Sequence, residues 1–261
     1  GGLASLGQPF KGILYTGNYQ FEKLITRSRN FDDSTGAYNG KNCHYQNKDF
    51  ELSSSLENCL LQSEKEQRIF FFAGNSHTDH HRTLHYKLHK ANGVGIFSTT
   101  ISTCIFPADN NQDHCKRNSQ SIIETWILEN IKQRDVVVIS NRNISNFENT
   151  DKNYSWLLTR SSIEAINEFS RLILSKGGKV ILFAPTPEFE SSIEECKTTW
   201  FRPFYNVNCT KTIEQVKEAK STVYFLINKY LDKNIYIYDP IPDICFEGIC
   251  SMTDKKSKPL Y

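Results

Sequence analysis

The first residue whose side chain could act in a reaction is Ser76, which follows a strongly apolar run and a glycine. The run Ile69–Ala73 predicts a buried strand, and Gly74 permits a tight turn before the amphipathic segment that begins at His77. Ser76 is then expected at a helix N-terminus, where unpaired backbone N–H groups and the helix dipole favour negative charge. Such groups stabilise the oxyanion of an attacked carbonyl. The same position also suits an ordinary N-cap serine, so the pattern allows a nucleophile or a cap.

Histidines form the second group, because four of them recur every fourth residue: His77, His81, His85 and His89. Within one helix this spacing places them on one face, and two of them at i and i+4 are able to bind a transition metal. The metalloprotease pattern H-E-x-x-H is absent, since Arg82 and Thr83 occupy its middle. We expect a solvated polar stripe and no metal site, with metal binding as the alternative.

Eight cysteines form the third group, and they fall into four neighbouring pairs along the chain. No C-x-x-C occurs, and no Cys/His cluster has zinc-finger spacing. An even number without metal spacing predicts disulfides and an oxidising compartment, whereas eight buried free thiols in a cytosolic enzyme are the alternative. Eight cysteines allow 105 pairings, and the simplest joins neighbours in sequence: Cys43–Cys59, Cys104–Cys115, Cys196–Cys209 and Cys245–Cys250.

Apolar runs and amphipathic segments alternate from residue 66 onward, which is typical of an α/β sheet. The strand candidates are continuous apolar runs, as in a parallel sheet covered on both faces. We expect strands over Arg68–Ala73, Val94–Ser98, Asp135–Ser140, Lys179–Ala184 and Ile235–Tyr238. We expect helices over His77–Ala91, Ser121–Lys132, Ser161–Ser175 and Thr212–Leu231. The prediction is an α/β, three-layer αβα domain over residues 66–261 with about five mostly parallel strands, preceded by an irregular lead-in over residues 1–65 that packs on it.

Two of the expected helices carry a capping box at their first residue. Ser121 is followed by Glu124, and Ser161 is followed by Glu164. These pairs predict helix starts at the two serines.

Composition excludes several classes of function. Lys and Arg exceed Asp and Glu by 31 − 29 = 2 among 261 residues, which gives no field for a polyanion, so no nucleic-acid partner is expected. The longest apolar runs fall far short of the roughly 20 residues that a membrane helix needs, and no signal peptide is recognisable. A protein that works outside the cytoplasm would therefore have its targeting element elsewhere, and the chain is expected to be an excised soluble domain.

The segment Gly74-Asn75-Ser76-His77 after a buried first strand resembles the G-D-S-H opening block of SGNH hydrolases. The similarity is closest to the SGNH domain that follows the membrane domain of acyltransferase-3 family O-acyltransferases. Thr99–Pro107 resembles the Ser/Thr-Cys-Pro stretch after the second strand of that domain, and Gly178–Pro187 resembles its strand with a Pro-x-Pro-like turn. Trp126–Ile139 and the tail from Tyr238 to Tyr261 resemble its helix–strand step and its last cysteine pair.

The resemblance implies a serine acyl-enzyme without a cofactor. Ser76 would be the nucleophile, His77 a residue that supports the turn, and Asn141 the side-chain donor of the oxyanion hole, with Arg142 and Asn143 as rivals for that donor. The remaining binding candidates are Gly74, Asn75, Ser102 and Thr103.

Two departures from the family pattern bear on catalysis. The Asp of the opening block is replaced by Asn75, which keeps part of the hydrogen bonding of the turn. The general base of the family lies in an Asp-x-x-His block, and this sequence has none in a plausible position. We expect that the block follows Tyr261 in the parent protein; loss of the catalytic dyad is the alternative.

The predicted function is an extracytoplasmic O-acyltransferase domain, with acetyl as the expected acyl group and a cell-surface glycan as the acceptor. The resemblance implies a membrane acyltransferase domain of the same polypeptide as the source of the acyl group. Two alternatives are an SGNH carbohydrate esterase and a glycan-binding module without catalysis.

Overall fold

The computed structural model describes residues 43–45, 56–63, 67–79, 81–101, 104–109, 117–142, 158–189, 196 and 209–252. The chain divides into two compact units, and each is described by itself. The larger unit is Phe31–Thr186 with Ala219–Pro240, and the smaller one is Gly1–Asn30, Pro187–Glu218 and Ile241–Tyr261.

A mostly parallel sheet forms the centre of the larger unit. Its five principal strands are β3 (Ile69–Gly74), β4 (Gly95–Ile101), β5 (Val136–Ser140), β6 (Lys179–Phe183) and β8 (Tyr236–Tyr238). They lie in the order β4-β3-β5-β6-β8, and every neighbouring pair is parallel. The five expected strands are confirmed.

The lead-in adds two short strands to the β4 edge. The strand β1 (His44–Tyr45) pairs parallel to β4, and β2 (Leu60–Leu61) follows the 3₁₀ turn η2 (Leu56–Cys59) and pairs antiparallel to β4. The disulfide Cys43–Cys59 joins the start of β1 to the end of η2. The described part of the lead-in is therefore hydrogen-bonded into the sheet.

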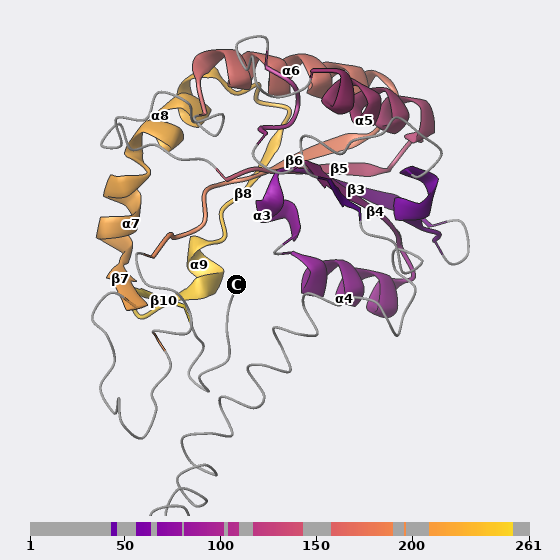
Figure 1. Ribbon diagram of the computed structural model, residues 1–261. Helices are drawn as coiled ribbons and strands as arrows, with labels where there is room; N and C mark the ends of the chain where they lie inside the picture. Colours follow the sequence, from indigo (N-terminus) through magenta and orange to yellow (C-terminus); the bar gives the residue numbers. More distant parts are fainter. Residues whose placement is uncertain are drawn as a thin grey trace, which may run out of the picture. The chain divides into compact units, whose positions relative to one another are not determined.

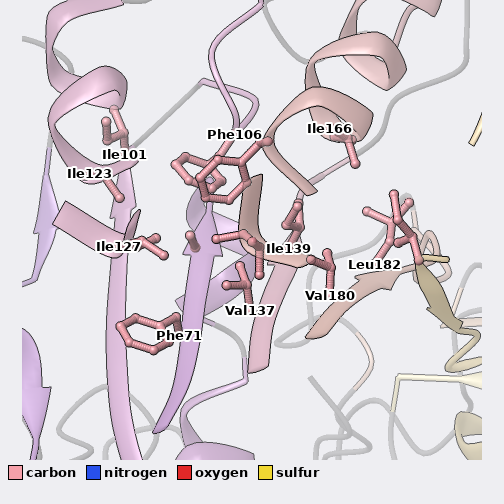
Figure 2. Packing of buried hydrophobic residues seen from close by; sticks show 14 of the residues in the cluster. Phe71, Ile101, Phe106, Ile123, Ile127, Val137, Ile139, Ile166, Val180 and Leu182 are labelled. Carbon is pink, nitrogen blue, oxygen red and sulfur yellow. The ribbon is translucent and has the colours of Figure 1, made fainter. Parts of the chain in front are cut away.

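Helices cover both faces of this sheet (Figure 1). On one face lie α5 (Arg117–Asn130), α6 (Arg160–Ser175) and α8 (Ser221–Tyr230), and on the other lies α4 (Arg82–Asn92). Because side chains alternate along a strand, each buried strand supplies both faces. In β5, Val137 and Ile139 join the core cluster beneath α5 and α6 (Figure 2), whereas Val136 and Val138 join the second cluster on the other face. The predicted three-layer αβα architecture is confirmed.

The expected start of α5 is wrong. The helix begins at Arg117, so Ser121 lies inside it and is exposed. The Glu124 carboxylate does not close a capping box, because its Oε1 accepts a hydrogen bond of 2.8 Å from the backbone N–H of Ala108. Glu124 is thus bonded to the loop that contains Ala108, 16 residues earlier in the sequence.

The capping residue of α6 also differs from the prediction. Thr159 is the N-cap, and it forms a reciprocal box with Ser162. Ser161 Oγ instead donates 2.8 Å to the buried carboxylate of Asp109, and Glu164 pairs with Arg160 on the surface. The serine that the pattern selected is thus bonded to a tertiary partner.

The helix expected over Thr212–Leu231 is two helices, α7 (Ile213–Ala219) and α8. Thr212 ends β7 (Thr210–Thr212), where its Oγ1 accepts from the Gln215 N–H while Gln215 Oε1 accepts from the Thr212 N–H. Lys220 separates the helices with φ −109° and ψ 9°, outside helical geometry.

The smaller unit contains a short three-stranded antiparallel sheet in the order β7-β10-β9. The strands β9 (Cys245–Phe246) and β10 (Ile249–Ser251) follow the short helix α9 (Ile241–Ile244). The disulfides Cys196–Cys209 and Cys245–Cys250 both lie in this unit.

Three of the four expected disulfides are therefore confirmed. Cys104 is also disulfide-bonded, but its expected partner Cys115 lies outside the described residues. In the described part of the chain, no helix combines the length and the apolar character needed to cross a membrane.

Candidate active site

The candidate site lies where the strand order of the larger unit reverses. The chain goes from β3 outward to β4 on one side, and then returns to β5 on the other side of β3. Ligands of open parallel sheets bind beside the carboxyl ends of the strands at such a point. Gly74 ends β3, Ser140 ends β5, and the two are direct register partners. Ser76 follows Gly74 by two residues, and the sequence of the strand–turn–helix therefore places its hydroxyl at this edge.

Gly74 is required by the close approach of β3 to β5. A Cβ atom at this position would overlap the Ser140 carbonyl oxygen and the Thr78 hydroxyl. The fully buried Thr78 Oγ1 donates 2.7 Å to the same carbonyl oxygen. This bond fixes the short helix α3 (Ser76–Asp79) to the end of β5.

Asn75 connects the Ser76 turn to the loop after β5. Its side chain is 2% exposed, and its Oδ1 accepts 2.8 Å from the Arg142 N–H and 3.1 Å from the His77 N–H. Both bonds need only an acceptor oxygen, which Asn supplies as well as Asp. The replacement of the expected Asp therefore preserves these two hydrogen bonds.

Ser76 is the first residue of α3 and is half-buried. Among the hydrogen bonds of the described residues, none involves the Ser76 hydroxyl. His77 is also half-buried, and its backbone N–H belongs to the Asn75 turn. The expected role of His77 as a support of the turn remains a prediction for its side chain.

Asn141 is buried at the end of β5 and is bonded to the loop after β4. Its Oδ1 accepts 3.1 Å from the Phe106 N–H, and its Nδ2 donates 2.8 Å to the Phe106 carbonyl oxygen. The amide thus orients the segment that precedes the cis peptide Phe106–Pro107. One of its two Nδ2 hydrogens is used in this way, so the expected oxyanion donor would act with the other.

The remaining binding candidates are only partly described. Arg142 is half-buried, and its backbone N–H donates a hydrogen bond to Asn75 Oδ1. Ser102, Thr103 and Asn143 lie outside the described residues.

The expected histidine stripe is wrong in two respects. The segment His77–Ala91 is not one helix, because the His81 N–H bonds the Thr78 carbonyl oxygen at 3.1 Å and the chain turns between α3 and α4. His85 and His89 are also buried rather than solvated, at 0% and 9% exposure. The His85 ring packs on Phe72 at a centroid distance of 3.9 Å.

Two histidines of this group make tertiary hydrogen bonds that the spacing did not reveal. His89 Nδ1 donates 2.9 Å to the Val94 carbonyl oxygen, which ties α4 to the start of β4. His81 Nε2 lies 2.9 Å from the Ser140 hydroxyl, and its ring meets that of Phe183 edge-on. His81 therefore lies at the candidate site, between the carboxyl ends of β5 and β6. No periodicity signal distinguishes it from its neighbours.

The described residues contain no group of three or more His, Cys, Asp or Glu side chains arranged to hold a metal ion. The histidines are instead distributed among separate contacts of α3, α4 and the sheet.

Comparison with known families identifies the fold. The family described as SGNH domain (fused to AT3 domains) matches residues 42–261. The chain belongs to this SGNH family. The match includes the Ser76 turn, the loop after β5 and the two edge strands of the lead-in. It places the domain among SGNH-type acyltransferases and esterases.

A solved structure supports this fold. The SGNH domain is similar to the lipopolysaccharide acetyltransferase periplasmic domain of Salmonella ser. Paratyphi A, with 16% identity, a TM-score of 0.58, and coverage of 88% of this chain and 85% of that one. A candidate acylhydrolase from Bacteroides fragilis matches at 13% identity and a TM-score of 0.38, covering 76% of this chain and 82% of that one. A GDSL-like lipase from Bacteroides thetaiotaomicron matches at 14% identity and a TM-score of 0.37, covering 76% of this chain and 83% of that one. No curated protein matches the chain.

Proposed function

We propose that this SGNH domain is an extracytoplasmic O-acyltransferase that carries an acyl group, expected to be acetyl, on Ser76 and transfers it to a hydroxyl of a cell-surface glycan. The observation that carries the proposal is the position of Ser76 at the switch point of the sheet. There Gly74, Asn75 and Thr78 hold its turn against the end of β5. A nucleophile needs such fixed support because small displacements from the attack geometry reduce the rate strongly.

The proposed reaction has two steps. Ser76 Oγ gives its proton to a general base and bonds the acyl carbon. The ester bond of the donor breaks, and the base passes the proton to the departing oxygen, so the donor leaves as an alcohol. A glycan hydroxyl then attacks the acyl carbon, and Ser76 recovers its proton as the new ester forms. Water in place of the glycan would give the products of an esterase.

The developing oxyanion needs hydrogen-bond donors that are already in place. We assign the Ser76 backbone N–H and the Nδ2 group of Asn141 to this role. The Phe106 contact orients the Asn141 amide and prevents its rotation, which supports the assignment. Ser102, Thr103, Arg142 and Asn143 remain the candidates for contacts with the substrate.

The proposed compartment rests on the cysteines and the family. The disulfides Cys43–Cys59, Cys196–Cys209 and Cys245–Cys250 favour an oxidising environment. The similar Salmonella structure is a periplasmic domain, and SGNH domains of this family are fused to AT3 domains. We therefore propose that a membrane acyltransferase domain of the same polypeptide supplies the acyl group.

The test is Ser76→Ala in the protein expressed from its own reading frame, with an acetyl ester as substrate. Turnover should fall by several orders of magnitude, because no other group replaces the nucleophile. Ser121→Ala is the matched control, since Ser121 is exposed on α5. Turnover retained by Ser76→Ala would remove Ser76 from the mechanism. Absence of turnover in the unmodified protein would favour the glycan-binding module.

Acceptor analysis separates the transferase from the esterase. Acetyl groups on added cell-surface polysaccharide indicate transfer, whereas free acetate alone indicates hydrolysis.

A further inference from the structure

Two exposed tyrosines lie side by side on the last strand of the parallel sheet. Tyr236 and Tyr238 are two residues apart on β8, so their side chains lie on the same face. They are 62% and 39% exposed, although they pair with the partly buried Ile181 and the buried Phe183 of β6. Neighbouring tyrosine rings on one face combine apolar surface with a polar tip, a combination that is enriched at binding interfaces.

A row of direct contacts links these tyrosines to the candidate active site. The ring of Tyr238 lies 4.8 Å from that of Phe183, and Phe183 lies 4.8 Å from the His81 ring. His81 Nε2 in turn lies 2.9 Å from Ser140 Oγ. Ser140 is the register partner of Gly74. The exposed ring of Tyr238 therefore lies next to the carboxyl ends of β5 and β6, where the candidate site is located.

We propose that Tyr236 and Tyr238 form a platform that binds pyranose rings of the acceptor glycan beside Ser76. This inference rests on the proposed function and adds a binding subsite to it. The C–H face of a pyranose packs on an aromatic ring, and the exposed Tyr236 adds a phenolic hydroxyl that is able to hydrogen-bond a sugar hydroxyl. The platform thus offers both kinds of contact that a sugar needs.

The spacing of the two rings favours an oligosaccharide over a single sugar. Alternate residues of a strand are roughly 7 Å apart, which exceeds the width of one pyranose ring. An acceptor that spans both tyrosines would run along β8, and its end would approach the site through the position of Tyr238. A long glycan chain fits this path.

A second protein strand is the competing occupant. Among the described strands, β8 ends the order of the sheet, and Ile237 on its opposite face is 47% exposed. A strand at the end of a sheet is able to pair with another chain. The phenol-bearing face and its contacts with the candidate site favour the glycan, and strand pairing becomes an outcome of the test.

Binding is measured with surface polysaccharide purified from the cells that produce the protein, immobilised on a biosensor. All variants are made in a Ser76→Ala background, so that acyl transfer does not enter the signal. Tyr236→Ala should weaken binding several-fold, and Tyr236→Phe should retain most of it because the ring remains. Ile237→Thr is the matched control on the opposite face of the same strand, and it should bind like the Ser76→Ala parent.

Three results would overturn the platform: no binding by the Ser76→Ala parent, equal binding by Tyr236→Ala with an unchanged melting temperature, or a dimer in solution that Ile237→Thr dissociates. The last result would assign β8 to self-association. Failure of the acyl chemistry appears separately, as the lack of ester turnover in the protein with Ser76 intact.

Discussion

The two hydrogen bonds at Asn75 Oδ1 should be essential for the Ser76 turn. Replacement by Ala leaves the N–H groups of Arg142 and His77 without this acceptor, which they reach at 2.8 Å and 3.1 Å. An unsatisfied buried donor costs about 1–3 kcal/mol. Because both residues are half-buried and water reaches them in part, we take the lower half of that range for each. Asn75→Ala should then lower the free energy of unfolding by roughly 2–4 kcal/mol.

The assay is urea unfolding combined with a thermal melt at neutral pH. For a domain of this size the expected loss corresponds to a decrease in Tm of roughly 5–15 °C. Asn75→Asp should be at least as stable as the unmodified protein, because a carboxylate accepts the same two hydrogen bonds. Asn92→Ala is the matched control, since Asn92 is exposed at the end of α4.

Ester turnover should follow the same order, with Asn75→Ala well below both other proteins. The reasoning is refuted if Asn75→Ala unfolds within about 0.5 kcal/mol of the unmodified protein, the size of an ordinary surface substitution. It is equally refuted if Asn75→Asp is as unstable as Asn75→Ala, since the acceptor oxygen would then not be the important feature.

Two further predictions concern stability. Replacing Cys43 and Cys59 together by Ala opens a disulfide with a sequence separation of 16, which should lower the free energy of unfolding by about 3 kcal/mol, against about 2 kcal/mol for Cys245 and Cys250 with a separation of 5. Urea unfolding without reductant measures both, and a larger loss from the second pair would contradict the loop-entropy argument. Burial raises the pKa of Glu124 above its ordinary value of 4.5, a shift that the Ala108 N–H opposes and the Glu168 charge increases. A raised pKa means that the folded protein binds the proton more tightly, so this group's contribution to stability is present below pH 4.5 and is lost as the pH rises through the raised pKa. Glu124→Gln keeps an acceptor for Ala108 and should gain stability relative to the unmodified protein between pH 4 and pH 7. A difference that does not change with pH would show that Glu124 carries no shifted pKa.

The helix boundaries show where sequence reasoning failed and why. Glu124 and Glu164 have the spacing of capping boxes, but Glu124 bonds the Ala108 loop and Glu164 pairs with Arg160. A local pattern states which bonds are possible within four residues. It does not state that a distant backbone group will compete for the same oxygen.

The histidines show the same limit for burial. Their spacing of four residues describes one helix face only while the helix continues, and the turn after Thr78 ends that continuity. His85 and His89 then face the sheet. The His85 ring packs on Phe72, and His89 Nδ1 bonds the Val94 carbonyl oxygen. From their polarity alone we predicted that these histidines face solvent. Their actual partners belong to other elements, which the spacing within one helix does not reveal.

Sequence by itself determined the order and type of the principal elements. Continuous apolar runs such as Val136–Ile139 are buried on both faces, so they form parallel strands whatever the details of their neighbours. The Gly74 turn placed Ser76 after the first of these strands, and neighbouring cysteines indicated disulfides, three of which are seen complete in the described part of the chain.

Only the tertiary structure decided which side chains share the site. Asn75 and Arg142 are 67 residues apart in sequence, and Thr78 and Ser140 are 62 apart. They meet because β3 and β5 are adjacent and end at the same edge of the sheet. The position of His81 against Ser140, and the row of rings from Phe183 to Tyr238, arise from the same arrangement. Hydrogen bonds of this range depend on strand order, and strand order is set by how the whole sheet packs between its helices.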